Sequence, residues 1–535
     1  PLDISGVKFN ITLKNPMFYN SLEGDYVYNL QLPLTSKNKK NIKFSHRLET
    51  TQRPESQLFE GLFKGLKLFE GNLKYIGGKN SINSNINIGK DGFLNPSSKY
   101  YLDEVNYGKL TFIDQAAALT YFNDNVNKFY PDTDFALPYI RGITDSYLPA
   151  GTSGYHHKDD LNYWDQTLNT YVLDDSGDKG IIVPHLFLRF ILDKLFLESG
   201  YSYDDKVFSV DNDFKKLILF NVYNANNGIP NIDGKPGYDS DITNLVYNNH
   251  VPRVLITDFI TGLQNLLNVR FFFNHKNKHV SIISANDILD STDYIDITSK
   301  IHSKYELNLN KKNGFIIRST PDSADSYFAL KVEIENNYLK MYGGAVENIS
   351  DLPETYIGYL YYYVLSVDKF YGWSPSTEAW YQTTFNLITK FFVPPEDYKI
   401  ESIISTLHGL ELYPYNQHGN PAIDYRDITA RIIFYLGLVD VAGEYFPYSF
   451  YESGNYSLLY PKSTGLYQMH WKKYIDFMLD PKAIKINVLL SASDISNFDI
   501  SKKYRINGID YLIKNIKIPV TEKAILPATM ECYKV

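Results

Sequence analysis

Residues 257–282 read TDFITGLQNLLNVRFFFNHKNKHVSI and combine a helical period with a strand period. In the first half, apolar residues recur at the spacing of one helix face, which predicts a helix over 258–268 capped by Thr257 or Asp258. The central members of this apolar stripe are Phe259, Leu263 and Leu267. The polar residues fall opposite the stripe, so the helix is expected to bury one side only.

From Val269 onward the period changes to two, so Phe271 and Phe273 fall on one face of a strand. The polar stretch that follows predicts a turn and a returning strand, which gives a hairpin over 269–284. Neither the helix nor the hairpin can bury its apolar face alone. In the simplest interpretation, the phenylalanines form the core between the helix and the sheet. The alternative is that they line a groove that binds a ligand.

The composition is that of a globular protein with a large core. The chain has 535 residues, 44% of them hydrophobic and 21% charged, and aromatic residues reach 15%. A chain of this length exceeds what one hydrophobic core usually organises, so about three or four domains are expected.

Charge and cysteine content exclude several kinds of site. The formal net charge is -8, and Lys and Arg are scattered among the acids, so no direct nucleic-acid binding is expected. Cys532 is the one cysteine, which excludes a disulfide framework within the chain. No apolar run reaches the roughly 18 to 20 residues of a membrane-spanning helix. No signal peptide is recognised, and because the sequence begins at Pro1, residues are expected to be missing from its start.

The fold class predicted from these patterns is α+β, predominantly antiparallel β, with several domains built as β-barrel-like or sandwich modules and a helix-bearing middle region. An N-terminal β domain is expected over 1–112, and a helix followed by a loop-rich insertion over 113–180. An α+β domain over 181–300 would contain a helix at 184–199 as well as the helix and hairpin described above. Residues 301–535 are expected to be rich in strands.

The end of the chain carries the most specific local pattern. In KYRI-NG-IDYLIKNIKI, Asn507 and Gly508 stand where a two-residue hairpin turn is required, which predicts a hairpin over 503–518. Near the other end, the cluster SKNKKN (36–41) is expected to be an exposed turn.

Motifs for chemistry are weak, and no catalytic, cofactor-binding or metal-binding residue is predicted. The loop GYHHKDD around His156 and the acidic stretch 174–180 have metal-binding composition, but neither has the spacing of a known site. Glu347, Asp351 and Glu354 offer carboxylates in a tyrosine-rich region without a defined separation. Solvated loops are the simpler interpretation of the first two, and for the third the nearby aromatic residues fit a core as well as a sugar site, so no carboxylate is predicted to be catalytic.

Four stretches resemble virion proteins encoded by phages and prophages of Bacteroidetes-type bacteria. They are LEGDYVYNLQLPLTSKNKKNIKFSHRLE (22–49), VPHLFLRFILDKLFLESGYSYD (183–204), the opening helix and hairpin continued through NDILDSTDYIDIT (286–298), and INGIDYLIKNIKIP (506–519). The resemblance implies a tail hub or baseplate hub protein that joins the tail tube to the tip and fibres. It further implies a homo-oligomer, most simply a trimer, with two related β-barrel-like domains in each subunit. Tail tube, tape-measure and fibre proteins would be its partners, in a virion assembled in the host cytoplasm.

Three functions therefore compete. The first is a structural tail subunit without catalysis, in which Phe259, Leu263, Leu267, Phe271, Phe273, Asn507 and Gly508 build the core and the assembly surfaces. The second is a glycan-binding or receptor-binding tail protein that uses the tyrosines at 356–381. The third is a glycoside hydrolase or peptidase within a tail, for which the sequence offers no motif.

Overall fold

The computed structural model describes a large part of the chain. The described residues are 6–19, 26–41, 57–77, 81–88, 100–139, 162–172, 182–208, 213–220, 242–274, 277–303, 305–308, 315–319, 342–346, 348–354, 361–364, 369–374, 378–382, 391–392, 398–402, 405–406, 431–441, 443–450, 452–458, 463–479 and 481–535. Many antiparallel strands lie in several sheets with a few helices between them, which confirms the predicted α+β class.

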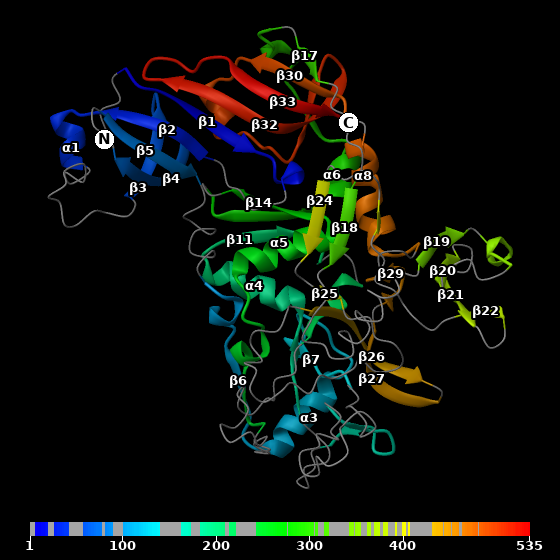
Figure 1. The fold of residues 1–535 in the computed structure, drawn as a ribbon. Helices are drawn as coiled ribbons and strands as arrows, with labels where there is room; N and C mark the ends of the chain where they lie inside the picture. The colour runs from blue at the N-terminus through cyan, green and yellow to red at the C-terminus, as the bar shows by residue number, and fades with distance from the viewer. Residues whose placement is uncertain are drawn as a thin grey trace.

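One sheet contains strands from both ends of the chain (Figure 1). We call this sheet, together with its hydrophobic core, the sheet module. Strand β1 (Lys8–Lys14) pairs antiparallel with β32 (Ile509–Thr521), with Ile11 opposite Ile518. The order continues from β32 through β33 (Ala528–Lys534) and β30 (Ala483–Val488) to β17 (Glu306–Asn308). On the other side of β1 follow β2 (Tyr26–Pro33), β5 (Ser81–Ile88), β4 (Leu66–Gly77) and β3 (Gln57–Phe63). The segments predicted separately as 1–112 and 301–535 thus share hydrogen bonds.

The sheet module curves around its own core but does not close into a barrel among the described strands, because β3 and β17 each end the order. Its core joins N-terminal and C-terminal residues, including Leu32 and Leu73 with Ile486 and Ile516. Strand β31 (Lys503–Ile506) pairs with β32 and with β16 (Tyr294–Asp296). Helix α9 (Ala492–Ser496) lies against β4.

A second core lies below the sheet module, in what we call the central module (Figure 1). Helix α5 (Ile256–Leu267) leads into the hairpin of β14 (Val269–Asn274) and β15 (His279–Ser284). Strand β11 (Ser202–Asp205) extends this hairpin by parallel pairing with β15. The other helices here are α4 (Leu188–Glu198), α6 (Ala285–Asp290), α8 (Lys472–Leu479) and the π-helix η11 (Tyr467–Trp471).

Short strands and one further helix complete the central module. Helix α3 (Gln115–Asn125) is capped by Asp114, whose carboxylate accepts the Ala117 N–H at 2.8 Å. The strands are β6 (Lys109–Thr111), β7 (Phe135–Ala136), β8 (Trp164–Asp165), β9 (Thr170–Tyr171), β10 (His185–Leu186), β12 (Leu217–Phe220), β13 (Asn244–Val246), β25 (Ser405–Thr406), β26 (Arg431–Val441), β27 (Glu444–Phe450), β28 (Glu452–Ser453) and β29 (Tyr456–Ser457). The short 3-10 helices here are η1 (Pro16–Phe18), η3 (Leu102–Glu104), η5 (Phe214–Lys216) and η6 (Tyr247–His250). A further one, η7 (Thr298–Lys300), lies in the sheet module, where the Leu489 N–H donates to Lys300 O.

Between β17 and β26 the chain forms two small sheets. Strand β18 (Phe315–Ser319) pairs with β23 (Phe391–Phe392) and with β24 (Tyr398–Ser402), and β24 lies beside α5. The second sheet stands to the side in Figure 1 and contains β19 (Tyr342–Val346), β20 (Tyr361–Val364), β21 (Lys369–Ser374) and β22 (Ala379–Gln382), with η8 (Ile349–Asp351) after β19.

Three local predictions differ from the structure. Residues 36–41 form helix α1 (Ser36–Asn41) instead of an exposed turn, because the buried Asn38 donates a hydrogen bond to Pro33 O at 3.0 Å. The helix predicted from 184 begins at 188, since His185 pairs in β10. Helix α5 begins after Leu255 without a side-chain cap, so neither Thr257 nor Asp258 serves as N-cap.

Candidate functional site

The predicted aromatic stretch lies inside the central module. Phe259, Leu263, Leu267 and Phe271 are fully buried, and Phe273 is partly buried at the edge of the same core. The Phe271 ring lies 6.3 Å from that of Phe196 on α4. These side chains therefore join helix and sheet, and they leave no groove for a ligand.

The turn at Asn507 and Gly508 joins β31 to β32 as a two-residue connection. Both residues are left-handed, with φ of 49° and 80°. Tight hairpin turns of this kind require positive φ at both central residues, which Asn and Gly tolerate best. The Asn507 N–H also donates to Thr298 Oγ1 at 2.9 Å, so the turn is tied to the neighbouring chain.

Asn15 lies where the two modules meet, directly after β1. Its side chain is fully buried and donates to Ile500 O at 2.9 Å and to Ile513 O at 2.8 Å, while it accepts the Met17 N–H at 2.9 Å. One amide thus fixes the start of the chain to two carbonyls of the C-terminal segment. Sequence reasoning missed this residue, although an Asn before Pro is a known turn signal.

The 3-10 turn η1 inserts next to Asn15 and joins the two cores. Met17 and Phe18 are buried in the core of the central module. The Phe18 ring lies 4.9 Å from that of Tyr533 on β33, and Tyr474 of α8 donates its hydroxyl to Met17 O at 2.7 Å. We call Asn15 with η1 the joint. It ties both chain ends to the central module.

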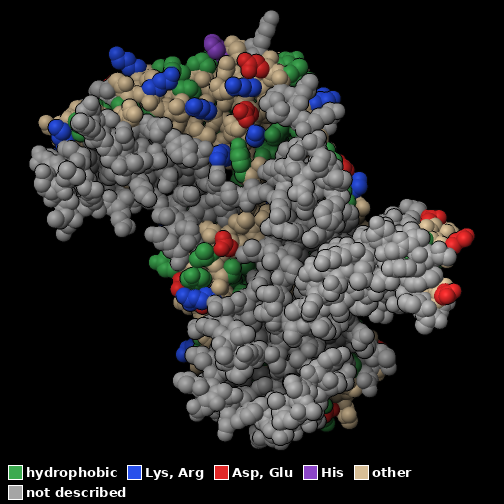
Figure 2. All heavy atoms as spheres, viewed as in Figure 1, with side chains coloured by type: hydrophobic (Ala, Val, Ile, Leu, Met, Phe, Trp, Pro, Cys, Tyr) green, Lys and Arg blue, Asp and Glu red, His purple; other side chains and the backbone are tan. Residues whose placement is uncertain are grey.

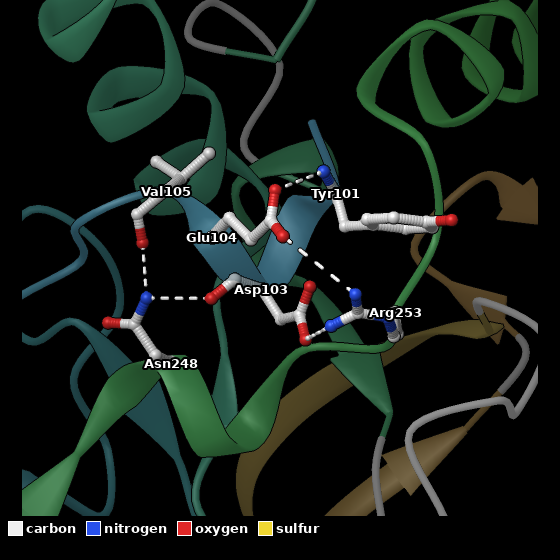
Figure 3. A network of polar contacts seen from close by, with 6 residues as sticks. All are labelled: Tyr101, Asp103, Glu104, Val105, Asn248 and Arg253. Carbon is white, nitrogen blue, oxygen red and sulfur yellow. Dashed lines mark hydrogen bonds and ion pairs between the residues drawn. The ribbon is translucent and has the colours of Figure 1, made fainter. Parts of the chain in front are cut away.

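The segment 100–108, which we call the strap, packs against the central module (Figure 3). Arg253 stands over the Tyr101 ring at 4.2 Å and forms ion pairs with Asp103 at 3.3 Å and Glu104 at 3.8 Å. The Glu104 carboxylate also accepts the Tyr101 N–H at 3.1 Å. These contacts fix the first half of the strap.

The remaining strap contacts involve the main chain. The Asn248 amide donates to Asp103 O at 2.9 Å and to Val105 O, as Figure 3 shows. The Asn106 N–H donates to the Glu198 carboxylate of α4. Amide and carboxylate side chains from the central module therefore satisfy strap backbone groups that η3 leaves without a partner in its own short helix.

A half-buried polar cluster lies between α4 and β11. Asp193 accepts hydrogen bonds from the hydroxyls of Tyr130 and Tyr203. Burial, and then this carboxylate, raises the pKa of both phenols well above the ordinary value. Burial also raises the pKa of Asp205. Phenols with raised pKa values stay neutral, so they act as hydrogen-bond donors that hold the packing.

Of the carboxylates singled out in the sequence, the structure describes Asp351 and Glu354. Asp351 bonds to the Asn348 N–H at 2.8 Å and caps η8, and Glu354 is exposed. His156, the stretch 174–180 and Glu347 lie outside the described residues. Within the described ranges, no three His, Cys, Asp or Glu side chains gather in a group that could hold a metal ion.

The tyrosine-rich segment proposed for glycan binding is described in part. Tyr371 and Trp380 pack against Leu352, and the Trp380 indole donates to Pro353 O at 2.6 Å. These two rings build the small core of the side sheet and are not an open platform. The described helices include none with the length and apolar character needed to span a bilayer.

The sheet module exposes apolar side chains at both ends of its strand order. Near β3 and at the start of β4, Leu62 is 61% and Leu66 45% exposed. At the β17 end, Tyr305 is 55% and Leu307 64% exposed. On the face in view in Figure 2, Lys and Arg side chains over this module stand singly between other residues and form no continuous patch.

Comparisons with known proteins find little. The chain matches no protein-family model and no curated protein. Among solved structures, it is similar to the 43 kDa tail protein of prophage MuSo2 from Shewanella oneidensis, at 8% sequence identity and a TM-score of 0.32. The alignment covers 98% of this chain and 93% of that chain.

Proposed function

We propose that this chain is a structural, non-catalytic subunit of a phage tail, the hub that joins the tail tube to the tip and fibres. In this role it would be assembled in the host cytoplasm and work in the virion as a homo-oligomer, most simply a trimer. The family resemblance of the four sequence stretches supports the tail assignment. The observation that carries the mechanical role is the single sheet that joins β1 to β32. Its described strands leave edges at β3, β17 and β16, and the first two of these edges carry exposed apolar side chains.

The two sheet ends suggest how copies would associate. A strand at a sheet edge can pair with another chain, and natural proteins usually cover or charge such edges. The β3 end and the β17 end belong to different strands, so contact between them in successive copies is head-to-tail. Head-to-tail contacts produce rings when the rotation closes, as a hub that encircles a tube requires.

The joint suits a part that transmits force. Asn15 and η1 connect the sheet module to the central module through buried hydrogen bonds and aromatic contacts. Several carboxylates described above form hydrogen bonds within the protein, to backbone groups or to other side chains. Such bonds stabilise the fold, as expected in a structural subunit. The hydrogen bonds of Asp193 and Asp351 are of this kind.

The oligomer is tested by measuring molar mass in solution with light scattering after size-exclusion chromatography. We expect the unmodified chain to have the mass of three copies, and the double variant Leu62→Lys with Leu307→Lys to have the mass of one. Ile113→Lys is the matched control, because Ile113 is 92% exposed and lies outside the sheet module. A single-copy mass for the unmodified chain at micromolar concentration contradicts the proposal.

The position in the particle needs a separate test. Electron microscopy of intact virions should place this chain in a ring between the tail tube and the tip. Density for the chain in a fibre alone, or no density in the virion, would rule out the hub.

A further inference from the structure

A cavity of about 370 Å³ opens between the last turn of α4 and the end of the strap. It is lined by Asn106, Tyr107, Gly108, Lys194, Leu197 and Glu198. Its volume is at the lower end of the range for small-molecule sites, about 300 to 1,000 Å³. The strap closes one wall, and its backbone position there is fixed by the Asn106 N–H bond to Glu198.

The charges around the cavity balance. Lys194 and Glu198 stand one turn apart on α4, so they face the same side of the helix. The Lys194 ammonium lies 5.3 Å from the centre of the Phe190 ring. With one positive and one negative group in the lining, the attraction of either kind of ion to one group is offset by its repulsion from the other. A neutral ligand with its own donors and acceptors is repelled by neither group.

The remaining lining fits the same kind of ligand. Leu197 is 72% exposed at the rim and offers an apolar surface. Gly108 has a φ of 87°, and a Cβ built there would meet nothing within 4 Å, so the space above it is open. The buried Tyr107 hydroxyl in the wall makes no hydrogen bond with the described residues. This hydroxyl is closed to solvent, so Tyr107 forms the wall and is not expected to bond to a ligand.

From this arrangement we propose that the cavity binds a neutral polyhydroxylated ligand, a single saccharide ring. One hydroxyl of the ring donates to the Glu198 carboxylate and a neighbouring hydroxyl accepts from the Lys194 ammonium. The C–H face of the ring packs on Leu197. This site lies apart from the tyrosine-rich side sheet and does not depend on the oligomer or on the proposed place in a tail.

Saturation-transfer NMR on the full-length chain tests the site, with glucose, galactose and N-acetylglucosamine as separate probes at millimolar concentration. At least one probe should show transfer with the unmodified protein. Lys194→Met and Glu198→Gln should each weaken its binding at least about tenfold, because each removes a hydrogen bond to a charged group. Lys472→Met and Asp476→Asn are the matched controls, since these residues form an ion pair one turn apart on α8.

Each outcome decides the matter. Loss of transfer in the α4 variants with retention in the α8 variants supports the site. No transfer for any of the three probes, or equal transfer in all variants, overturns it. Thermal unfolding of every variant is recorded first. If Glu198→Gln does not fold, the binding of the probes is compared in Lys194→Met and Leu197→Ser instead.

Discussion

Single buried amides and rings hold this protein together where regular secondary structure ends. The Asn15 side chain donates hydrogen bonds to the carbonyls of Ile500 and Ile513, about 500 residues away in the sequence, and accepts one from the nearby Met17 N–H. Arg270 is buried below the ring of Trp471, and its guanidinium donates to Val269 O at 2.8 Å. At such positions the cost of a substitution comes from the polar groups left without partners, more than from lost contact area.

Asn15→Ala should destabilise the protein by at least about 2 kcal/mol, because it leaves two carbonyl groups and one N–H without their partner in a dry site. Urea unfolding followed by circular dichroism measures the change. Asn277→Ala is the control, since Asn277 is exposed and should change stability by less than about 0.5 kcal/mol. Equal midpoints for the two variants would show that the Asn15 bonds contribute nothing.

Leu263→Asp should abolish soluble expression, because it places an unpaired charge in the core between α5 and the hairpin. Leu263→Ala keeps the site apolar and should fold with a loss of about 2 to 5 kcal/mol. Asp258→Asn, on the exposed side of α5, should express normally. A soluble, folded Leu263→Asp protein would mean that the helix does not pack as described.

At the scale of elements, the C-terminal hairpin depends on its turn and on one ion pair. Gly508→Ala should cost about 1 to 2 kcal/mol, because an L-residue is strained at a φ of 80°. Asn507→Gly keeps left-handed geometry accessible and should change stability by less than about 1 kcal/mol. Unfolding midpoints in urea compare the two variants, and a larger effect of Asn507→Gly would contradict the turn geometry.

The hairpin also predicts a dependence on pH. Arg505 donates to both oxygens of Asp510, at 2.7 Å and 2.9 Å, and these bonds lower the pKa of Asp510 below 3.8. A lowered carboxyl pKa stabilises the folded state above about pH 3.8, and this contribution is lost as the pH falls through the folded pKa. Asp510→Asn should therefore be less stable than the unmodified chain at about pH 6, and the difference should shrink toward about pH 2.5. A difference that stays constant with pH would exclude the carboxylate as its cause.

The sequence pattern predicted helices, strands and turns correctly where neighbouring residues alone determine the local structure. The period change at Val269 and the Asn507–Gly508 turn are features of neighbouring residues, and the structure shows a helix, a hairpin and a tight turn there. The pairing of β1 with β32 joins residues about 500 positions apart, and no periodicity specifies it. Helix α1 was missed for a different, local reason: the polar sequence SKNKKN is typical of a turn, whereas here Asn38 is buried and bonds to Pro33 O five residues earlier.

For the whole molecule, the joint should couple the unfolding of the two modules. Phe18→Ala removes a buried ring between them and should cost about 3 to 5 kcal/mol. Calorimetry should show one main transition for the unmodified chain and two separated transitions for the variant. Phe498→Ala, at a ring that packs within the sheet module alone, should leave the modules coupled. A single transition for Phe18→Ala at the unmodified temperature would show that the ring does not connect them.

The pairing of β1 with β32 also sets an order of events during synthesis. Strand β1 leaves the ribosome long before β32, its neighbour on one side, because about 500 residues separate the two strands. This side of β1 can be paired only after β32 has been made, because contacts between such distant segments must wait for the later one. A product terminated before β32 would leave that edge of β1 open, so such a product should not enter an assembly in the folded form described here.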